Sequence, residues 1–170
     1  MDSDENFFLT EPLVVKKDNL VKTWAKWGGN YNIKFDIKVS KRGSFDTYYS
    51  IMHFTTNGNC CGPTERIPGL WLHYKEQQRA YFYIATPNGL YEHGMDLDKW
   101  YSIEVNQLDG TCTLKMNGET KWSTNVPSLE YSNVKYYLSD PWHNSAEYDS
   151  EGNPSNNWIE MKNLKIQNGI

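Results

Sequence analysis

Residues 31–39 alternate strictly between large apolar and polar side chains along nine positions. The apolar positions are Tyr31, Ile33, Phe35, Ile37 and Val39. A period of two places one set of side chains on a core and the other set in solvent, which is the pattern of a half-buried β-strand. Antiparallel sheets commonly expose one face to water in this way. The segment therefore predicts an antiparallel sheet with a single buried face.

Similar segments recur along the chain, separated by short turn signals. The expected strands are residues 20–27, 31–39, 48–55, 69–75, 80–86, 100–108, 111–116, 120–123, 134–139 and 158–166. No helical period of 3.6 residues persists over ten residues. About ten or eleven short strands with regular turns are typical of a sandwich or barrel. We expect one all-β domain over residues 1–170, a two-sheet antiparallel β-sandwich, with residues 1–18 as an N-terminal extension or edge strand.

Glycine-containing turns predict how neighbouring strands connect. Asp109-Gly110 and Asn117-Gly118 favour two tight hairpins, so residues 100–123 are expected to form a three-stranded meander. The sequence Gly28-Gly29-Asn30 is interpreted as a further hairpin turn. In the last strand the apolar phase shifts after Met161, which predicts a β-bulge near Lys162 and Asn163.

Composition excludes several classes of function. The net charge of −4 comes without a basic block, so a nucleic-acid footprint is not expected. No run approaches the ~20 apolar residues that span a bilayer, so membrane insertion is not expected. The acidic start lacks an apolar signal core. The protein is then either cytoplasmic or a mature secreted form whose signal peptide is not part of this sequence, and we take the secreted, extracellular form as the hypothesis.

The three cysteines leave several pairings open. Cys60 and Cys61 are adjacent, while Cys112 shares its phase with Leu114 and Met116 and is expected in the core. One of the adjacent cysteines could pair with Cys112, the adjacent pair could form a vicinal disulfide, or all three could be thiols. Three cysteines are too few for a disulfide scaffold.

The order of these segments resembles the concanavalin A-like, laminin-G-like jelly-roll superfamily. The resemblance rests on the strands at 31–39 and 100–105, on the Leu114-to-Gly118 hairpin, on the Tyr137-to-Pro141 run, and on the closing strand at 159–166. It covers nearly the whole chain and implies a jelly-roll sandwich. Many members are lectins or extracellular adhesion modules, some of which bind Ca²⁺, and others cleave glycans, so the resemblance alone does not choose a function.

The segment 140–157 carries the most suggestive group of side chains. Its carboxylates and amides are hard oxygen ligands, which Ca²⁺ prefers. The candidate calcium ligands are Asp140, Asp149, Glu151 and Asn153. A flat aromatic ring beside amides and charged groups also suits a sugar. The candidate glycan-binding residues are Trp142, His143, Tyr148, Asn156 and Asn157 in this segment, Asn57, Asn59 and Arg66 in residues 56–68, and His73 on the following strand. Arg66 could equally be a structural anchor in a buried ion pair.

Motifs for catalysis are incomplete. Glu104 stands alone on its strand, without the second carboxylate that a jelly-roll glucanase carries nearby. His53, His73, Tyr74, Lys75 and Arg66 supply the residue types of a polysaccharide lyase, but not its spacing. His53 shares the phase of Tyr49 and Ile51, which favours a packed structural histidine, whereas His73 is out of phase with Leu72 and Tyr74. We therefore expect a lectin-like or adhesion module that binds glycan or an extracellular protein partner, with Ca²⁺ as the candidate cofactor. The alternative is a lyase or glycoside hydrolase.

Overall fold

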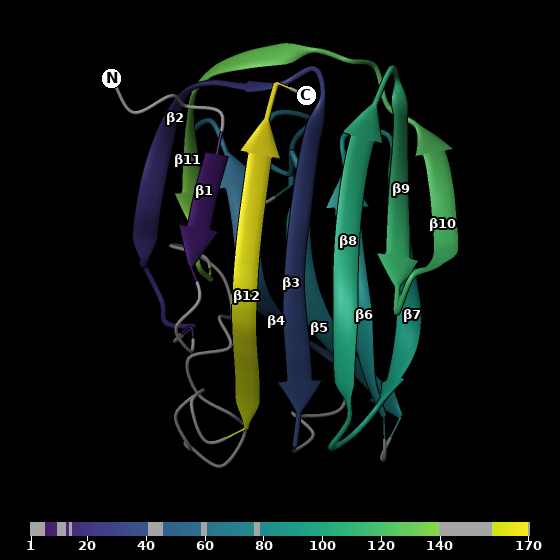
Figure 1. Cartoon of the computed structure of the whole chain (residues 1–170). Helices are drawn as coiled ribbons and strands as arrows, with labels where there is room; N and C mark the ends of the chain where they lie inside the picture. The colour runs from purple at the N-terminus through teal and green to yellow at the C-terminus, as the bar shows by residue number, and fades with distance from the viewer. Residues whose placement is uncertain are drawn as a thin grey trace.

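The computed structural model describes residues 6–9, 13, 15–40, 46–58, 61–76, 79–139 and 158–169. Within these residues, twelve strands build two antiparallel sheets packed face to face (Figure 1). The front sheet has the order β1 (Asn6–Leu9), β12 (Ile159–Asn168), β3 (Tyr31–Val39), β8 (Trp100–Leu108), β9 (Thr111–Met116) and β10 (Glu119–Asn125). The back sheet has the order β2 (Leu20–Gly28), β11 (Glu130–Tyr137), β4 (Thr47–Thr55), β5 (Gly69–Glu76), β6 (Arg79–Thr86) and β7 (Gly89–Asp96). The expected two-sheet β-sandwich is confirmed.

The meander and the bulge form as expected. Strands β8, β9 and β10 are consecutive neighbours, and the residues of both turns, Asp109-Gly110 and Asn117-Gly118, have positive φ at both positions. Positive φ at both central residues is what a type I′ hairpin requires. The pairing of β12 with β3 shifts between Lys162 and Lys165, and Asn163 has φ of 56°. This irregularity restores the apolar phase after Met161.

The connection at residues 28–30 is not the hairpin that its glycines suggested. Strand β2 pairs with β11 in the back sheet, whereas β3 pairs with β12 and β8 in the front sheet. The chain therefore crosses between sheets at this point. Trp24 and Trp27 of β2 are fully buried against the other layer, so their burial holds β2 in a different sheet from β3. A short Gly-rich turn looks the same in sequence whether it joins neighbours or changes layers.

Strand β7 is an edge strand that the sequence pattern did not reveal. It follows directly from the turn at Pro87 and Asn88 and pairs with β6 along its whole length. Its residues are mostly half-exposed, with Met95 as its buried side chain. An edge strand that buries few side chains needs few apolar residues, so the alternation of apolar and polar residues in its sequence is weak.

Aromatic side chains dominate the core between the sheets. Trp27 stacks on Phe54 with ring centroids 4.4 Å apart, and Phe54 stacks on Tyr136 at 4.7 Å. Trp27 also stacks on Tyr31 of the opposite sheet at 4.8 Å. Such offset ring pairs add to the free energy gained by burying their surface. The core thus joins the two sheets through ring contacts as well as aliphatic packing.

The cysteines divide between core and loop. Cys112 is a free thiol, fully buried as expected, and burial raises its pKa to about 12. Cys61 is disulfide-bonded. A bridge to Cys112, one of the three alternatives, therefore does not form, and neither does the all-thiol form. Cys60 lies outside the described residues.

No helix in the described part of the chain is long and apolar enough to cross a membrane.

Candidate functional site

The outer face of the back sheet gathers aromatic rings where a solvent-facing sheet usually carries charged side chains. Along β5, Leu70, Leu72 and Tyr74 point into the core, so the alternate residues Trp71, His73 and Lys75 point outward. Cross-strand neighbours on β4 and β6 extend this row. We call the outward-facing set the ring face; its members are Tyr48, His53, Trp71, His73, Tyr81 and Tyr83.

Rings on this face contact one another in sequence across three strands. Tyr48 stacks on His73 with centroids 3.9 Å apart and planes within 8° of parallel. Tyr83 meets Tyr48 edge-on at 5.2 Å and Trp71 at 5.8 Å. Trp71 in turn meets His53 at 5.3 Å. The rings therefore form one continuous series of contacts from β4 across β5 to β6.

A glycine makes room for the indole of Trp71. A Cβ atom at Gly69 would lie 2.1 Å from the ring of Trp71, which is closer than any real contact. The ring therefore lies back along its own strand over Gly69. Trp71 is 7% exposed and supports its neighbours, while Tyr48 is 41% exposed and is the ring most open to solvent.

His53 reaches the ring face through a bulge in β4. The pairing of β4 with β5 shifts between Ser50 and Met52, so His53 pairs with Gly69 and no longer shares the inward phase of Tyr49. Simple alternation would place His53 on the same face as Tyr49, and the bulge turns it to the opposite face. The packed structural role is confirmed, since His53 is fully buried and its Nε2 donates to the backbone carbonyl of Glu65.

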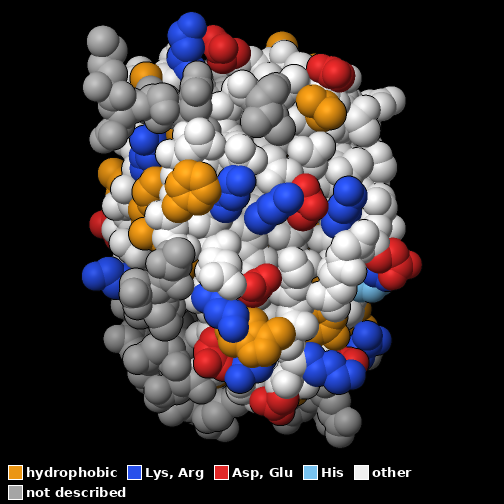
Figure 2. All heavy atoms as spheres, in the orientation of Figure 1, with side chains coloured by type: hydrophobic (Ala, Val, Ile, Leu, Met, Phe, Trp, Pro, Cys, Tyr) orange, Lys and Arg blue, Asp and Glu red, His pale blue; other side chains and the backbone are white. Residues whose placement is uncertain are grey.

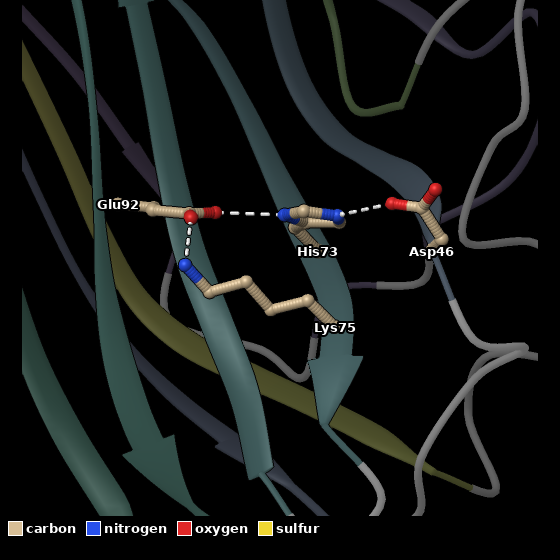
Figure 3. A network of polar contacts seen from close by, with 4 residues as sticks. All are labelled: Asp46, His73, Lys75 and Glu92. Carbon is tan, nitrogen blue, oxygen red and sulfur yellow. Dashed lines mark hydrogen bonds and ion pairs between the residues drawn. The ribbon is translucent and has the colours of Figure 1, made fainter.

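His73 lies at the centre of a charged network on the same face (Figure 3). Its Nδ1 is 2.7 Å from Glu92 Oε2, and its Nε2 is 3.4 Å from Asp46 Oδ1. Lys75 pairs with the other oxygen of Glu92. Both imidazole contacts can be hydrogen bonds at once only when the ring carries two protons, because a carboxylate only accepts. The stacked Tyr48 covers His73, so the side chain of His73 is only 7% exposed.

Charges around the network shift nearby titratable groups. Partial burial acts to raise the pKa of Glu92, but hydrogen bonds from Lys75 and His73, with their charges, outweigh it and lower the pKa. Partial burial and the carboxylates of Glu92 and Asp46 raise the pKa of Tyr48. Burial also raises the pKa of Tyr83, and Arg66 partly opposes this rise. Both phenols are therefore hydroxyl groups at neutral pH and can donate hydrogen bonds.

The loop before β5 brings Arg66 to the edge of the ring face. The charge of its guanidinium acts to lower the pKa of Tyr83, and its Nε is buried without a hydrogen-bond partner among the described residues. The neighbouring Glu65 anchors the loop instead: it is buried, and it accepts hydrogen bonds from Thr55 and from Asn57 at 2.9 Å. The amide of Asn57 is thus used inside the loop, while Arg66 borders the rings.

The candidate site residues from the sequence separate into three groups. The structure brings Arg66 and His73 to one face, and it places Asn57 in the loop anchor. The other candidates lie outside the described residues; they are Asn59, Trp142, His143, Tyr148, Asn156 and Asn157 for glycan and Asp140, Asp149, Glu151 and Asn153 for calcium. Within the described ranges no group of three or more His, Cys, Asp or Glu side chains is placed to hold a metal ion.

Sequence reasoning missed Tyr48, Trp71, Tyr83 and Glu92. A usable signal was present, because Trp71 and Tyr83 occupy the outward phase of strands whose inward phase is already apolar. Aromatic residues in both phases indicate a strand with two occupied faces. Glu104, considered with the histidines as a catalytic candidate, lies on the outer face of the front sheet beside Lys34 and Asn32. Glu104 and His73 are therefore on opposite sides of the sandwich.

Comparison with known proteins identifies the fold. No protein-family model and no curated protein sequence matches the chain. Among solved structures, a family 7 alginate lyase from Zobellia galactanivorans is similar over 86% of this chain and 66% of its own, with 13% identity and a TM-score of 0.56. A heptameric SAP-like pentraxin from Limulus polyphemus is similar over 100% of this chain and 80% of its own, with 11% identity and a TM-score of 0.58.

An alginate lyase from Pseudomonas aeruginosa is similar over 99% of this chain and 84% of its own, with 9% identity and a TM-score of 0.57. This chain spans somewhat under two thirds of the Zobellia lyase and 20% of a sialidase from Trypanosoma rangeli. At these identities the likeness concerns the fold. The architecture is a two-sheet jelly-roll sandwich, and the likeness to these structures agrees with the fold expected from the sequence.

Proposed function

We propose that this chain is a carbohydrate-binding module and that the ring face is where the glycan binds. The observation that carries the proposal is a row of contacting rings in which Tyr48 and Tyr83 are open to solvent and are supported by Trp71 and His73, with Lys75 and Glu92 beside them. A sugar presents apolar C–H faces to aromatic rings and hydroxyl groups to charged and amide side chains. The ring face offers both kinds of partner on one surface.

Structural neighbours support the same class of ligand. They include proteins whose names state that they are alginate lyases and a sialidase, and a pentraxin. Fold similarity does not transfer an activity. The proposal therefore rests on the ring face of this chain, and the neighbours make a sugar the first ligand class to test.

Binding is favoured over cleavage by the state of the polar groups. Eliminative cleavage of a uronate chain needs a base for the sugar C–H proton and an acid for the leaving oxygen. Partial burial and neighbouring groups raise the pKa values of Tyr48 and Tyr83, so their phenols are hydrogen-bond donors and the base would have to be another group. Each nitrogen of His73 faces a carboxylate. A lyase is the second candidate, because Arg66, Tyr83 and His73 share a face on which Arg66 could neutralise a uronate carboxylate.

Calcium and an extracellular location are further parts of the proposal. The candidate calcium ligands are Asp140, Asp149, Glu151 and Asn153. The disulfide at Cys61 supports an oxidising compartment, since cytosolic proteins seldom keep disulfides. Protein partners remain the alternative to glycan for an adhesion module.

A glycan array read with Ca²⁺ and again with chelator tests the proposal. We expect retention of specific glycans, and a loss of at least tenfold in affinity for Tyr83→Ala and Tyr48→Ala, because each removes a ring contact and a hydroxyl donor. Phe8→Ala is the matched control for neutral glycans: its ring is 57% exposed on the opposite sheet, beside Lys165. Blank arrays in both conditions would reject glycan binding, and a loss of retention on chelation would support the calcium part.

Incubation with uronate polysaccharides separates the second candidate from the first. A lyase generates unsaturated ends that absorb ultraviolet light, and His73→Ala would abolish their formation. Product formation by the wild-type chain would replace the binding hypothesis with the enzyme. Binding without product supports the module.

A further inference from the structure

We infer that the outer face of the front sheet is a second, separate binding surface, for an anionic polysaccharide. Figure 2 shows this face, with lysine side chains spread across it between a few acidic and apolar ones. Residues on β3, β8, β9 and β12 supply the charges. We call the set the lysine face; its members are Lys34, Lys38, Lys115, Lys162 and Lys165, with Trp100 beside them.

Strand register gathers lysines that are far apart in the sequence. Lys165 pairs across to Lys34, Lys34 pairs to Glu104, and Glu104 pairs to Lys115. These four residues therefore form one row across four strands, about 4.8 Å apart from strand to strand. The sequence contains no basic block, because each strand contributes only one or two of the lysines.

Part of the positive charge on this face is not neutralised by carboxylates. Lys34 pairs with Glu104 at 3.5 Å, and Lys38 pairs with Glu160 at 2.6 Å. Lys115, Lys162 and Lys165 form no ion pair with any other described residue. A protein with a net charge of −4 thus keeps a local excess of positive charge on a flat sheet face.

Trp100 places an aromatic ring inside the charged area. It is 39% exposed, and the ammonium groups of Lys162 and Lys38 lie 4.0 Å and 5.4 Å from its ring centre. The cation–π contacts hold both lysines near the ring. A sugar ring can pack beside Trp100 while its acidic substituents reach the lysines.

Spacing and charge density favour a polysaccharide over a nucleic acid. Duplex DNA carries one charge per ~1.7 Å, which needs a dense basic surface. Here Asp36, Glu104 and Glu160 are interspersed among the lysines, so the face suits a polymer with widely spaced charges. A chain of carboxylated sugars, with one carboxylate on each sugar, has charges spaced in this way.

Salt-dependent retention on immobilised heparin and on polygalacturonate tests the inference, with neutral dextran as the blank. The test variant carries Lys115→Gln, Lys162→Gln and Lys165→Gln. We expect roughly a tenfold loss of affinity at ~0.1 M salt and a shallower salt dependence, since each lysine that meets an anion releases counterions. Trp100→Ala is the second variant, expected to weaken binding without changing the salt slope.

A matched control removes the same charge elsewhere. Lys26, Lys99 and Lys121 each pair with a carboxylate away from the lysine face, so their triple replacement by Gln is expected to leave retention unchanged. Equal losses in both triple variants would show a net-charge effect and overturn the inference. Failure of the wild-type chain to be retained, or stronger retention on duplex DNA, would also overturn it.

The ring-face variant Tyr83→Ala keeps the two proposals distinguishable. It should bind heparin as the wild type does, and the lysine-face triple variant should keep its binding to the array ligand. Loss of both activities in Tyr83→Ala would show that one surface accounts for all binding, which contradicts a separate lysine face.

Discussion

Glu92 connects the charged side chains of the ring face. Its carboxylate accepts from His73 on one oxygen and from Lys75 on the other, so it joins β5 to the edge strand β7. The side chain is 24% exposed, and its neighbours hold its pKa below the ordinary value despite the opposing effect of burial. The ionised form is therefore favoured in the folded state, which couples folding to pH.

Replacing Glu92 with Gln should make the free energy of unfolding depend less on pH in the acid range. A carboxyl whose pKa is lower when folded than when unfolded stabilises the fold above its unfolded pKa, and that stability is lost as the pH falls through the folded pKa. We expect the wild type to be more stable than Glu92→Gln above about pH 5, and this margin to shrink below about pH 4.5. Urea unfolding at a series of pH values measures this.

The comparison variant is Glu119→Gln. Glu119 also has a lowered pKa, through its hydrogen bond to Lys121, but it is fully exposed, where ion pairs contribute little. Its pH profile should follow the wild type closely. Parallel profiles for Glu92→Gln and wild type would mean that Glu92 does not couple folding to pH.

Turns and bulges determine which face each strand presents. At the crossing from β2 to β3, Gly28 has φ of 99° and lies against the Leu129 carbonyl, which a Cβ atom would approach to 2.4 Å. Gly29 also has positive φ, 67°, but a Cβ atom there would meet nothing within 4 Å. A side chain at Gly29 would therefore meet only backbone strain, whereas a side chain at Gly28 would meet both backbone strain and a steric clash.

We predict that Gly28→Ala destabilises the fold much more than Gly29→Ala does. The second change should cost about 1 kcal/mol for left-handed backbone alone. The first adds a collision with a carbonyl that also accepts a hydrogen bond from Gly29, so we expect about 3 kcal/mol in total. Chemical denaturation of both variants measures the difference. Equal losses would indicate that the backbone at Leu129, just before β11, moves away to admit the methyl group.

Strand alternation explains why so much of the fold was predictable. The alternation in residues 31–39 predicts both a strand and which of its faces is buried. The Asp109-Gly110 and Asn117-Gly118 pairs predict the turns of the meander. The crossing at Gly28 and the bulge in β4 were not predictable, because both depend on which distant strand lies alongside. A bulge of one residue moved His53 to the ring face. The ring face could not be predicted from the sequence for the same reason. Its residues become neighbours only through the register of β4, β5, β6 and β7.

At the scale of the molecule, the sandwich carries its two proposed binding surfaces on opposite outer faces, with the core between them. Aromatic contacts link the sheets through that core, as between Phe35 of β3 and Phe82 of β6, whose ring centroids are 6.2 Å apart. Both rings are essentially unexposed. The outer faces can therefore vary their side chains without disturbing the contacts that close the sandwich.

Coupling between Phe35 and Phe82 should be measurable as a property of the closed sandwich. Each change to Ala is expected to cost about 3–5 kcal/mol. The double variant should cost less than their sum by about 0.5–1.5 kcal/mol, because the ring pair is lost only once.

Phe7→Ala combined with Phe82→Ala is the control, since β1 is at one end of the front sheet and β6 is near the other end of the back sheet (Figure 1). That pair should be additive. If the Phe35 and Phe82 changes were fully additive as well, the two sheets would not be joined through these rings. Denaturant unfolding followed by tryptophan fluorescence and by circular dichroism provides the four free energies, and coincident transitions from the two probes would show that the sheets unfold together as one domain.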